Sequence, residues 1–173
     1  LLIYDKQYPL TIDPFSLLWG TFLGVPNSVS VFYLQNMCLD SDMNYLFTGE
    51  TNTNFPTTVG AYSTTNAGNR DAFVTKLDSS GTTLIYSTYI GGTNTDKAFI
   101  IDVNANDEAV VGGNSESFNF PTVAGCYTTT KISSGYDGVC FVLSDSGNAL
   151  VASTFFGIVA GNTNPFGLGV ASN

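Results

Sequence analysis

Histidine is absent from this sequence of 173 residues, and arginine occurs once, at Arg70. Histidine is the side chain that most often moves protons near neutral pH, so its absence removes the commonest general acid or base. One arginine cannot build the arginine cluster that holds a carboxylate substrate. The 14 acidic residues leave a carboxylate pair for glycoside hydrolysis formally open, but most fall in predicted turns, where they have a structural role. We therefore expect no enzymatic activity.

Basic side chains are scarce as well, because only 5 stand against 14 acidic ones, for a formal net charge of −9. No basic cluster is present to neutralise phosphates, which argues against nucleic acid and anionic membranes as partners. Charged residues make up only 11% of the chain, and Thr, Ser, Asn and Gly fill the polar positions, as is typical of secreted or surface β proteins. No apolar run approaches the roughly 20 residues that span a bilayer. We expect an extracellular or outer cell-surface location.

The sequence is nevertheless 43% hydrophobic, and one stretch of it is repeated. Asp71 to Gly92 reads DAFVTKLDSSGTTLIYSTYIGG, and Asp137 to Gly157 reads DGVCFVLSDSGNALVASTFFG. The same 66 positions separate the matching residues of four pairs: Asp71 and Asp137, Gly81 and Gly147, Thr88 and Thr154, Gly91 and Gly157. A constant separation indicates a repeat architecture.

Each repeat is predicted to hold four short antiparallel strands. In Asp71 to Ile90 the side chains alternate between two faces, and Asp78 to Gly81 supplies a tight turn, since glycine can take the positive φ that a hairpin needs. Apolar residues occur on both faces, which is typical of a sheet that is covered on both sides. A second hairpin is predicted within Val29 to Gly49 and again within Ala98 to Gly113. The fold class is therefore all-β. The residues expected to be buried are Phe73, Leu77, Ile85, Val139 and Val142.

A longer segment connects the hairpins, at Asn54 to Tyr62 and again at Asn119 to Tyr127. Both copies contain Phe-Pro-Thr, and because proline fixes φ and lacks an amide donor, we expect an ordered loop. The aromatic residues expected to hold this loop to the core are Phe55 or Phe120 and Tyr62 or Tyr127.

The period divides the chain into about two and a half units. They comprise the degenerate end of a preceding unit at 1–16, a first repeat at 17–82, a second at 83–148 and the start of a third at 149–173. Leu17 to Gly24 match Leu84 to Gly91, so the repeat begins before the first complete copy. An open stack exposes apolar sheet faces, and the chain has no initiating Met. We expect it to be part of a larger polypeptide or assembly.

Three phrases recur in a fixed order: Phe-Pro-Thr-Thr-Val-Gly-Ala-Tyr, Asp-Ala-Phe-Val-Thr-Lys-Leu and Tyr-Ser-Thr-Tyr-Ile-Gly-Gly. With them, residues 17–173 closely resemble the bacterial seven-bladed β-propeller repeat family. The resemblance implies a propeller of four-stranded blades in secreted or cell-surface proteins, frequent in Bacteroidota, where such chains often use a type 9 secretion system. It brings no catalytic residue. The second copy departs from the pattern at Asp137 to Leu143, which lacks the lysine.

Three cysteines, Cys38, Cys126 and Cys140, cannot all pair with one another, and their spacing matches no zinc site. Cys140 takes the place of Val74, and Cys126 takes that of Ala61, which predicts two small apolar core residues. The alternative is a Cys126–Cys140 disulfide, which implies an oxidising compartment.

Two groups of residues are candidate ligand sites. Asp102, Asn104 and Asn106 place oxygen side chains at alternate positions, as a calcium loop does, but a plain hairpin turn explains them without a metal. Asp107 replaces the central glycine of such a loop, which argues against calcium, and no other cofactor is indicated. Exposed aromatic residues offer a sugar-binding surface, against the alternative that they anchor loops and core: Tyr62, Tyr127 and Tyr136.

The combined pattern favours a non-catalytic surface propeller that acts as a scaffold or interaction module, with a protein or glycan partner at the loops along the blade edges. One alternative is a propeller-fold hydrolase or lyase whose catalytic residues lie outside this chain. Another is a structural subunit of a surface filament or secretion assembly.

Overall fold

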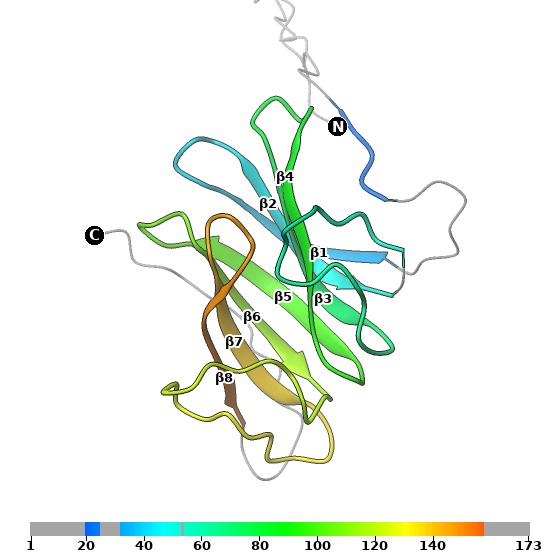
Figure 1. Ribbon diagram of the computed structural model, residues 1–173, viewed down its shortest axis with the longest axis vertical. Coiled ribbons are helices and arrows are strands. Elements are labelled where there is room, and N and C mark those ends of the chain that lie inside the picture. Colours follow the sequence, from blue (N-terminus) through cyan, green and yellow to red (C-terminus); the bar gives the residue numbers. More distant parts are fainter. Residues whose placement is uncertain (1–19, 25–31, 53, 158–173) are drawn as a thin grey trace, which may run out of the picture.

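A computed structural model describes residues 20–24, 32–52 and 54–157. Within these ranges the protein is all-β, with eight strands and no helix (Figure 1), which confirms the predicted fold class at this level. The strands are β1 (Phe32–Leu39), β2 (Tyr45–Thr51), β3 (Asp71–Leu77), β4 (Leu84–Ile90), β5 (Asp96–Val103), β6 (Ala109–Ser115), β7 (Asp137–Leu143) and β8 (Leu150–Phe156).

The strands form two four-stranded antiparallel sheets, in the orders β1-β2-β3-β4 and β5-β6-β7-β8. Within each sheet every strand pairs with its neighbour in the sequence, and the pairs β1–β2, β3–β4, β5–β6 and β7–β8 are the hairpins that the turn signals predict. The predicted unit boundaries at 82/83 and 148/149 fall in the turns before β4 and β8. The sequence units and the sheets therefore have the same period but begin at different strands.

The hairpin predicted at Asp71 to Ile90 is confirmed, because β3 and β4 pair antiparallel from Ala72 and Ile90 to Leu77 and Leu84. The Gly81 amide donates to the Asp78 carbonyl over 2.9 Å, and the Asp78 amide donates to the Thr83 carbonyl over 3.0 Å. Gly81 has a φ of 70°, the left-handed conformation that glycine adopts without steric cost. The turn thus closes where the sequence predicts it.

The two sheets pack against each other, with β5 lying against β1 and β2 (Figure 1). Apolar residues from the facing sides of both sheets form one continuous core. Its buried members include Leu46, Val74 and Tyr86 from the first sheet and Ile101, Val111 and Phe141 from the second. Each large apolar side chain buried in this way contributes about 1.5–3 kcal/mol. The stacking of the sheets is therefore a major source of stability.

Three of the five residues expected to be buried are buried, namely Phe73, Leu77 and Val139. Val142 is half-buried. The expectation for Ile85 is wrong, because 42% of its surface is exposed. The register shifts between Lys76 and Leu77, so Ile85 is the extra residue of a β-bulge and has no partner on β3.

The loop anchors are confirmed for phenylalanine and only partly for tyrosine. Phe55 and Phe120 are buried, and the Phe55 ring lies 4.5 Å from the Phe73 ring. Tyr62 is 38% exposed, whereas Tyr127 is 87% exposed and anchors nothing. The two copies of the loop therefore differ in how their tyrosines are used.

All three cysteines are free and half-buried, so the Cys126–Cys140 disulfide is not formed. Cys38 packs against the core between the sheets. Burial, together with the charges of Asp102 and Asp40, raises the pKa of the Cys38 thiol to about 12. This thiol is therefore an apolar packing group and not a nucleophile at neutral pH.

Some expectations fall on other parts of the chain. The degenerate strand at 1–16 and the third unit from 158 onward lie outside the described residues. Residues 20–24 match the end of β4 in sequence but form no strand.

Candidate functional site

The loops that precede β3 and β7 meet beside the junction of the two sheets and leave a pocket of about 370 Å³ between them. We call it the loop pocket. Most of its wall comes from the loop and strands of the first sheet, and one side comes from the second sheet. Its lining residues include Tyr62, Ser63, Thr65, Asp71, Tyr89 and Asn119.

The loop before β3 is held along the outer edge of β4. The Thr58 amide donates to the Ser87 carbonyl over 3.1 Å, and the Tyr89 amide donates to the Ser63 carbonyl over 3.0 Å. The Ser63 amide in turn donates to the Thr88 hydroxyl over 2.8 Å. These bonds satisfy backbone groups of an edge strand and fix the loop. The pocket is consequently preformed.

The second sheet closes the pocket through contacts that cross the junction. The Tyr62 amide donates to the Gly147 carbonyl in the turn before β8 over 2.9 Å. The Asn119 side-chain oxygen accepts from the Thr93 amide over 2.9 Å. Arg70 and Thr95 form a parallel bridge, so the chain segments before β3 and β5 run together. The position of Asn119 beside Tyr62 thus depends on the stacking of the sheets.

Two fully buried carboxylates, Asp71 and Asp96, lie at this junction. Asp71 Oδ2 accepts from the Ala67 amide over 2.6 Å, and Asp96 Oδ2 accepts from the Gly92 amide over 2.6 Å. The Oδ1 atom of each accepts no hydrogen bond. A Cβ on Gly91 would lie 2.6 Å from Asp71 Oδ1 and 2.8 Å from Asp96 Oδ2, so both carboxylates crowd the same glycine.

The protonation of Asp71 reflects this crowding. Burial and the neighbouring charge of Asp96 raise the pKa of Asp71 to about 7, although the Ala67 amide favours the ionised form. Burial likewise raises the pKa of Asp96. Two acids without a cation between them resist ionising together. Asp71 is therefore an acid that titrates near neutral pH and lines a pocket.

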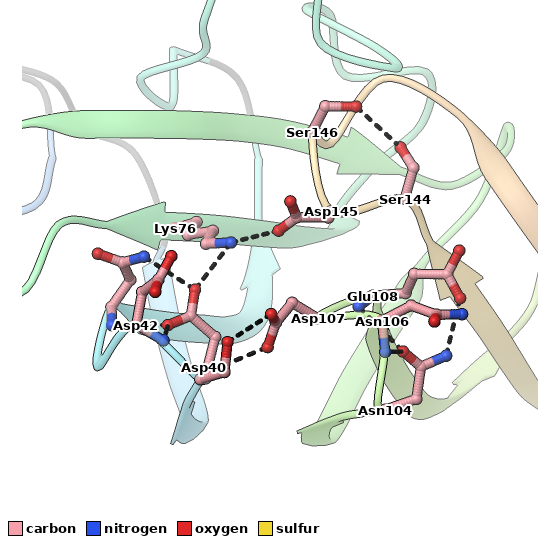
Figure 2. A network of polar contacts seen from close by, with 12 residues as sticks. Asp40, Asp42, Lys76, Asn104, Asn106, Asp107, Glu108, Ser144, Asp145 and Ser146 are labelled. Carbon is pink, nitrogen blue, oxygen red and sulfur yellow. Dashed lines mark hydrogen bonds and ion pairs between the residues drawn. The ribbon is translucent and has the colours of Figure 1, made fainter.

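The opposite ends of the strands carry a different polar network, which Figure 2 shows. Lys76 is buried and pairs with Asp40, with 2.8 Å between Nζ and Oδ2, and with Asp145 of the second sheet. Asp107 of the second sheet accepts from the Ser41 hydroxyl over 2.6 Å and from the Ser41 amide over 2.9 Å. These ion pairs and hydrogen bonds connect the turns of the first sheet to the turns of the second, which indicates a structural role.

A second surface is the side of the first sheet that faces away from the second, which we call the outer face. An apolar cavity of about 460 Å³ lies between this face and residues 20–23, and its lining residues on the sheet include Leu34, Met37, Tyr45, Phe47 and Leu77. Met37 pairs with Phe47 in the register of β1 and β2, just as Ile101 pairs with Val111 in that of β5 and β6. Ile101 is 5% exposed and Met37 is 49% exposed. Equivalent positions are thus covered in one sheet and open in the other.

Comparison with families and curated proteins identifies no relative of this chain. No family model matches the chain, and no curated protein matches it. Within the described ranges, no helix is long and apolar enough to cross a membrane. A function therefore has to be argued from the loop pocket, the outer face and the repeat.

The candidate calcium residues lie in and beside the turn between β5 and β6. Asn104 Oδ1 accepts from the Asn106 amide over 2.9 Å and from the Glu108 amide over 3.1 Å, and Asn104 Nδ2 donates to Glu108 Oε2 over 2.7 Å. Asp102 Oδ1 accepts from the adjacent Val103 amide. The side chain of Asn104 thus builds its own turn. In the part of the chain that the structure describes, no group of three or more His, Cys, Asp or Glu side chains is placed to hold a metal ion.

The three candidate sugar-binding tyrosines do not line one surface. Tyr62 lines the loop pocket, whereas Tyr127 is exposed on the other loop. Tyr136 is half-buried, and its ring lies 5.2 Å from the Lys97 ammonium. Only Tyr62 therefore belongs to the pocket.

Sequence reasoning missed Asp71, Asp96 and Asn119 as site residues. A signal was present for Asp71, because it recurs as Asp137 at the start of a strand that is otherwise apolar on both faces. A charged residue at such a place needs a partner. Its neighbour Asp96 comes from the next sheet, which only the stacking of the sheets reveals.

Proposed function

We propose that this chain forms two blades of a β-propeller that works as a non-catalytic interaction module, outside the cell or at its outer surface. The observation that carries this proposal is the loop pocket, a preformed polar hollow between the loops of two neighbouring sheets. Binding sites are commonly built from loops that a rigid scaffold holds in place. The partner is a protein or a glycan that reaches this end of the stack.

Two further features support the propeller. Successive four-stranded antiparallel sheets that repeat in sequence and pack on one another are what a propeller needs. The outer face of the first sheet is apolar and half-open, where the equivalent residues of the second sheet are covered by the first. A face of this kind is suited to a further sheet, so the chain acts as part of a larger scaffold.

The composition of the pocket supports binding over catalysis. Tyr62 offers an aromatic surface at its wall, and Ser63, Thr65 and Asn119 offer polar groups. Aromatic and amide groups together suit sugar rings and polar protein side chains. The chain has no histidine to act as a general base. Among the described residues, Asp71 is the one carboxylate that lines the pocket, and its neighbour Asp96 is fully buried, whereas glycoside hydrolysis requires two carboxylates that reach the substrate.

The test is a binding screen of the purified protein against a glycan array and a panel of purified surface proteins, followed by titration of the hits. Tyr62→Ala should weaken binding at least about tenfold, since truncating an aromatic side chain that is a binding hot spot typically costs about 2 kcal/mol or more. Tyr127→Ala is the matched control, because Tyr127 is the equivalent residue of the other loop and lies outside the pocket. Equal effects of the two variants would contradict a site at the loop pocket.

Two other outcomes would redirect the proposal. Turnover of a glycan that one carboxylate substitution abolishes would identify a hydrolase or lyase. Filaments seen by electron microscopy of the purified protein would favour a structural subunit of a surface assembly. A monodisperse particle that binds without turnover supports the interaction module.

A further inference from the structure

The apolar cavity on the outer face corresponds to a part of the second sheet that is filled. Five of the sheet residues that line the cavity have equivalents in the register of the second sheet. The cavity residues are Leu34, Met37, Tyr45, Phe47 and Leu77, and their equivalents are, in the same order, Ala98, Ile101, Ala109, Val111 and Leu143. All five equivalents are buried in the core between the two sheets. The first sheet therefore repeats, on its outer face, a surface that a neighbouring sheet covers in the second.

Tyr86 of β4 is part of what covers that surface of the second sheet. Its side chain is only 2% exposed and belongs to the same core cluster as Val111 and Leu143. A Cβ on Gly147, in the turn before β8, would lie 2.4 Å from atoms of the Tyr86 ring, so the ring reaches the second sheet. Aromatic side chains bury a large apolar area when they pack in this way. An aromatic residue of the fourth strand thus packs onto the sheet that follows.

The residue that matches Tyr86 in the preceding repeat is Trp19. The match of residues 17–24 with residues 84–91 aligns Trp19 with Tyr86. Trp19 is the one tryptophan of the chain and stands directly before the first described residue, Gly20. The repeat therefore supplies an aromatic residue, with a larger ring than tyrosine has, at the position from which the outer face would be covered.

Leu23, which follows in the same segment, already packs as this alignment requires. Its match in β4 is Ile90, which is fully buried in the core between the sheets. Leu23 is half-buried and packs against the cluster that contains Phe73. Phe73 and the cavity residue Leu77 lie on the same side of β3, because side chains alternate along a strand. The segment therefore contacts the outer face of the first sheet as β4 contacts the second sheet, although residues 20–24 form no strand.

We propose that the side chain of Trp19 fills the cavity on the outer face, as the Tyr86 ring fills the corresponding place between the two sheets. Gly20 lines the cavity, and consecutive Cα atoms lie about 3.8 Å apart, so the Trp19 side chain begins at the cavity wall. The cavity of about 460 Å³ is lined mainly by apolar side chains and is large enough for an indole ring. Leu34 and Met37 are each 49% exposed, so the rim is open to water, which can accept a hydrogen bond from the indole N–H.

A tethered segment has an advantage over a separate partner for this cavity. A group held by a short linker is present at an effective concentration on the order of millimolar, so a separate protein would have to bind correspondingly tightly to displace Trp19. Trp19 corresponds to a single residue of a preceding sheet, so its docking is compatible with a longer stack. The inference goes beyond the proposed function and does not depend on the loop pocket.

The test is NMR spectroscopy of the full chain with labelled methionine, leucine and isoleucine methyl groups. Nuclear Overhauser effects should connect the indole protons of Trp19 with the methyl groups of Met37 and Leu77. Trp19→Gly should shift these methyl resonances, because the ring current is lost. The methyl resonances of Ile101 and Leu143, the equivalents in the second sheet, are the matched control and should stay in place, which also shows that the fold is retained. Unchanged Met37 and Leu77 resonances, or no Overhauser effect from the indole, overturn the proposal.

Free indole gives a second test, because Trp19→Gly should leave the cavity empty. Apolar cavities that a substitution has emptied bind small aromatic molecules. Indole should therefore bind Trp19→Gly saturably, with shifts of the Met37 and Leu77 methyl resonances, and should not shift them in the unsubstituted protein. Trp19→Phe retains a ring and should bind indole more weakly than Trp19→Gly does. Equal binding to the unsubstituted protein and to Trp19→Gly, or no binding to Trp19→Gly, contradicts the proposal.

A second copy of the chain is the alternative occupant of the outer face. If the Met37 and Leu77 resonances shift with protein concentration and not with Trp19→Gly, a second copy covers this face and the proposal falls. Resonances that respond to Trp19→Gly at every protein concentration support it. Failure of these tests leaves the interaction module as it stands, because they substitute no residue of the loop pocket.

Discussion

At the scale of single residues, Asp71 makes the stability of the protein depend on pH near neutrality. Its pKa is raised to about 7 in the folded chain, chiefly by burial, against about 3.9 when unfolded. Between these values the folded state binds a proton that the unfolded state has lost. The free energy of unfolding should therefore fall as pH rises from about 4 to 7 and then level, by roughly 4 kcal/mol from this group alone.

Asp71→Asn is expected to remove most of the decrease in the free energy of unfolding between about pH 4 and pH 7. Urea unfolding at a series of pH values measures this. Asp137→Asn should act in the opposite sense, because a carboxyl with a lowered pKa contributes stability above about pH 4 that is lost on acidification. If both substitutions changed the pH dependence of the free energy of unfolding in the same direction, the pKa values of Asp71 and Asp137 would not be shifted in opposite directions.

Lys76 joins the two sheets at the end of the strands opposite Asp71, because it forms ion pairs with Asp40 and Asp145. Its ammonium is buried, and so is the carboxylate of Asp40 that it pairs with. Lys76→Met would leave that carboxylate without its cation, which typically costs about 3–5 kcal/mol. Asp145→Asn, which removes the exposed partner, should cost less than about 1 kcal/mol. Urea unfolding at pH 7 compares the two, and equal losses would mean that burial does not decide the effect.

At the scale of strands, a β-bulge decides which apolar residues of the β3–β4 hairpin are covered. Leu77 is buried, and Ile85 is the extra residue that points to solvent. Leu77→Ala should therefore destabilise the protein by about 2–5 kcal/mol, and Ile85→Ala by less than about 1 kcal/mol. Reversible unfolding titrations measure both. If Ile85→Ala destabilised the protein as much as Leu77→Ala, the Ile85 side chain would have to be buried, contrary to its 42% exposure.

The turn before β8 is also a contact between the sheets. Gly147 has a φ of 69°, and a Cβ on it would lie 2.4 Å from ring atoms of Tyr86 in the first sheet. Gly60 has a φ of 83° and no neighbour within 4 Å of such a Cβ. Gly60→Ala should cost about 1–2 kcal/mol for the backbone alone, and Gly147→Ala should cost distinctly more because the sheets must separate. Thermal unfolding of the two variants is the measurement, and similar losses would argue against this contact.

Local signals predicted the strands, the Asp78 to Gly81 turn and the phenylalanine anchors, because each depends on a few neighbouring residues. The bulge at Ile85 was not predictable, since alternation continues through it in the sequence. Tyr127 reads like Tyr62, yet its exposure depends on what lies beside each loop. The approach of Asp96 to Asp71 joins two sheets, and no pattern within one strand encodes it. The features that could not be predicted are therefore mainly those that depend on how the two sheets pack against each other.

At the scale of the whole molecule, the stack is asymmetric. The first sheet covers one side of the second, and the residues so covered correspond to those of the outer face, which remains half-open. The repeats also differ in their buried charges. Asp71 and Asp96 are buried at the junction of the two sheets, whereas Lys131 is buried in the loop before β7. Both features follow from repeats that keep one fold while individual positions diverge.

Met37 and Ile101 test whether the outer face is built to be covered, because they are equivalent residues with different exposure. Ile101→Lys puts an unpaired charge into the core and should cost about 4 kcal/mol or more, whereas Met37→Lys in this chain should cost less than about 1 kcal/mol. In a polypeptide extended by a preceding repeat, a further sheet would cover Met37, and the two costs should become similar. Urea unfolding of both variants in both lengths measures this. If Met37→Lys stays neutral in the longer polypeptide, the outer face is a solvent-exposed surface and the stack ends there.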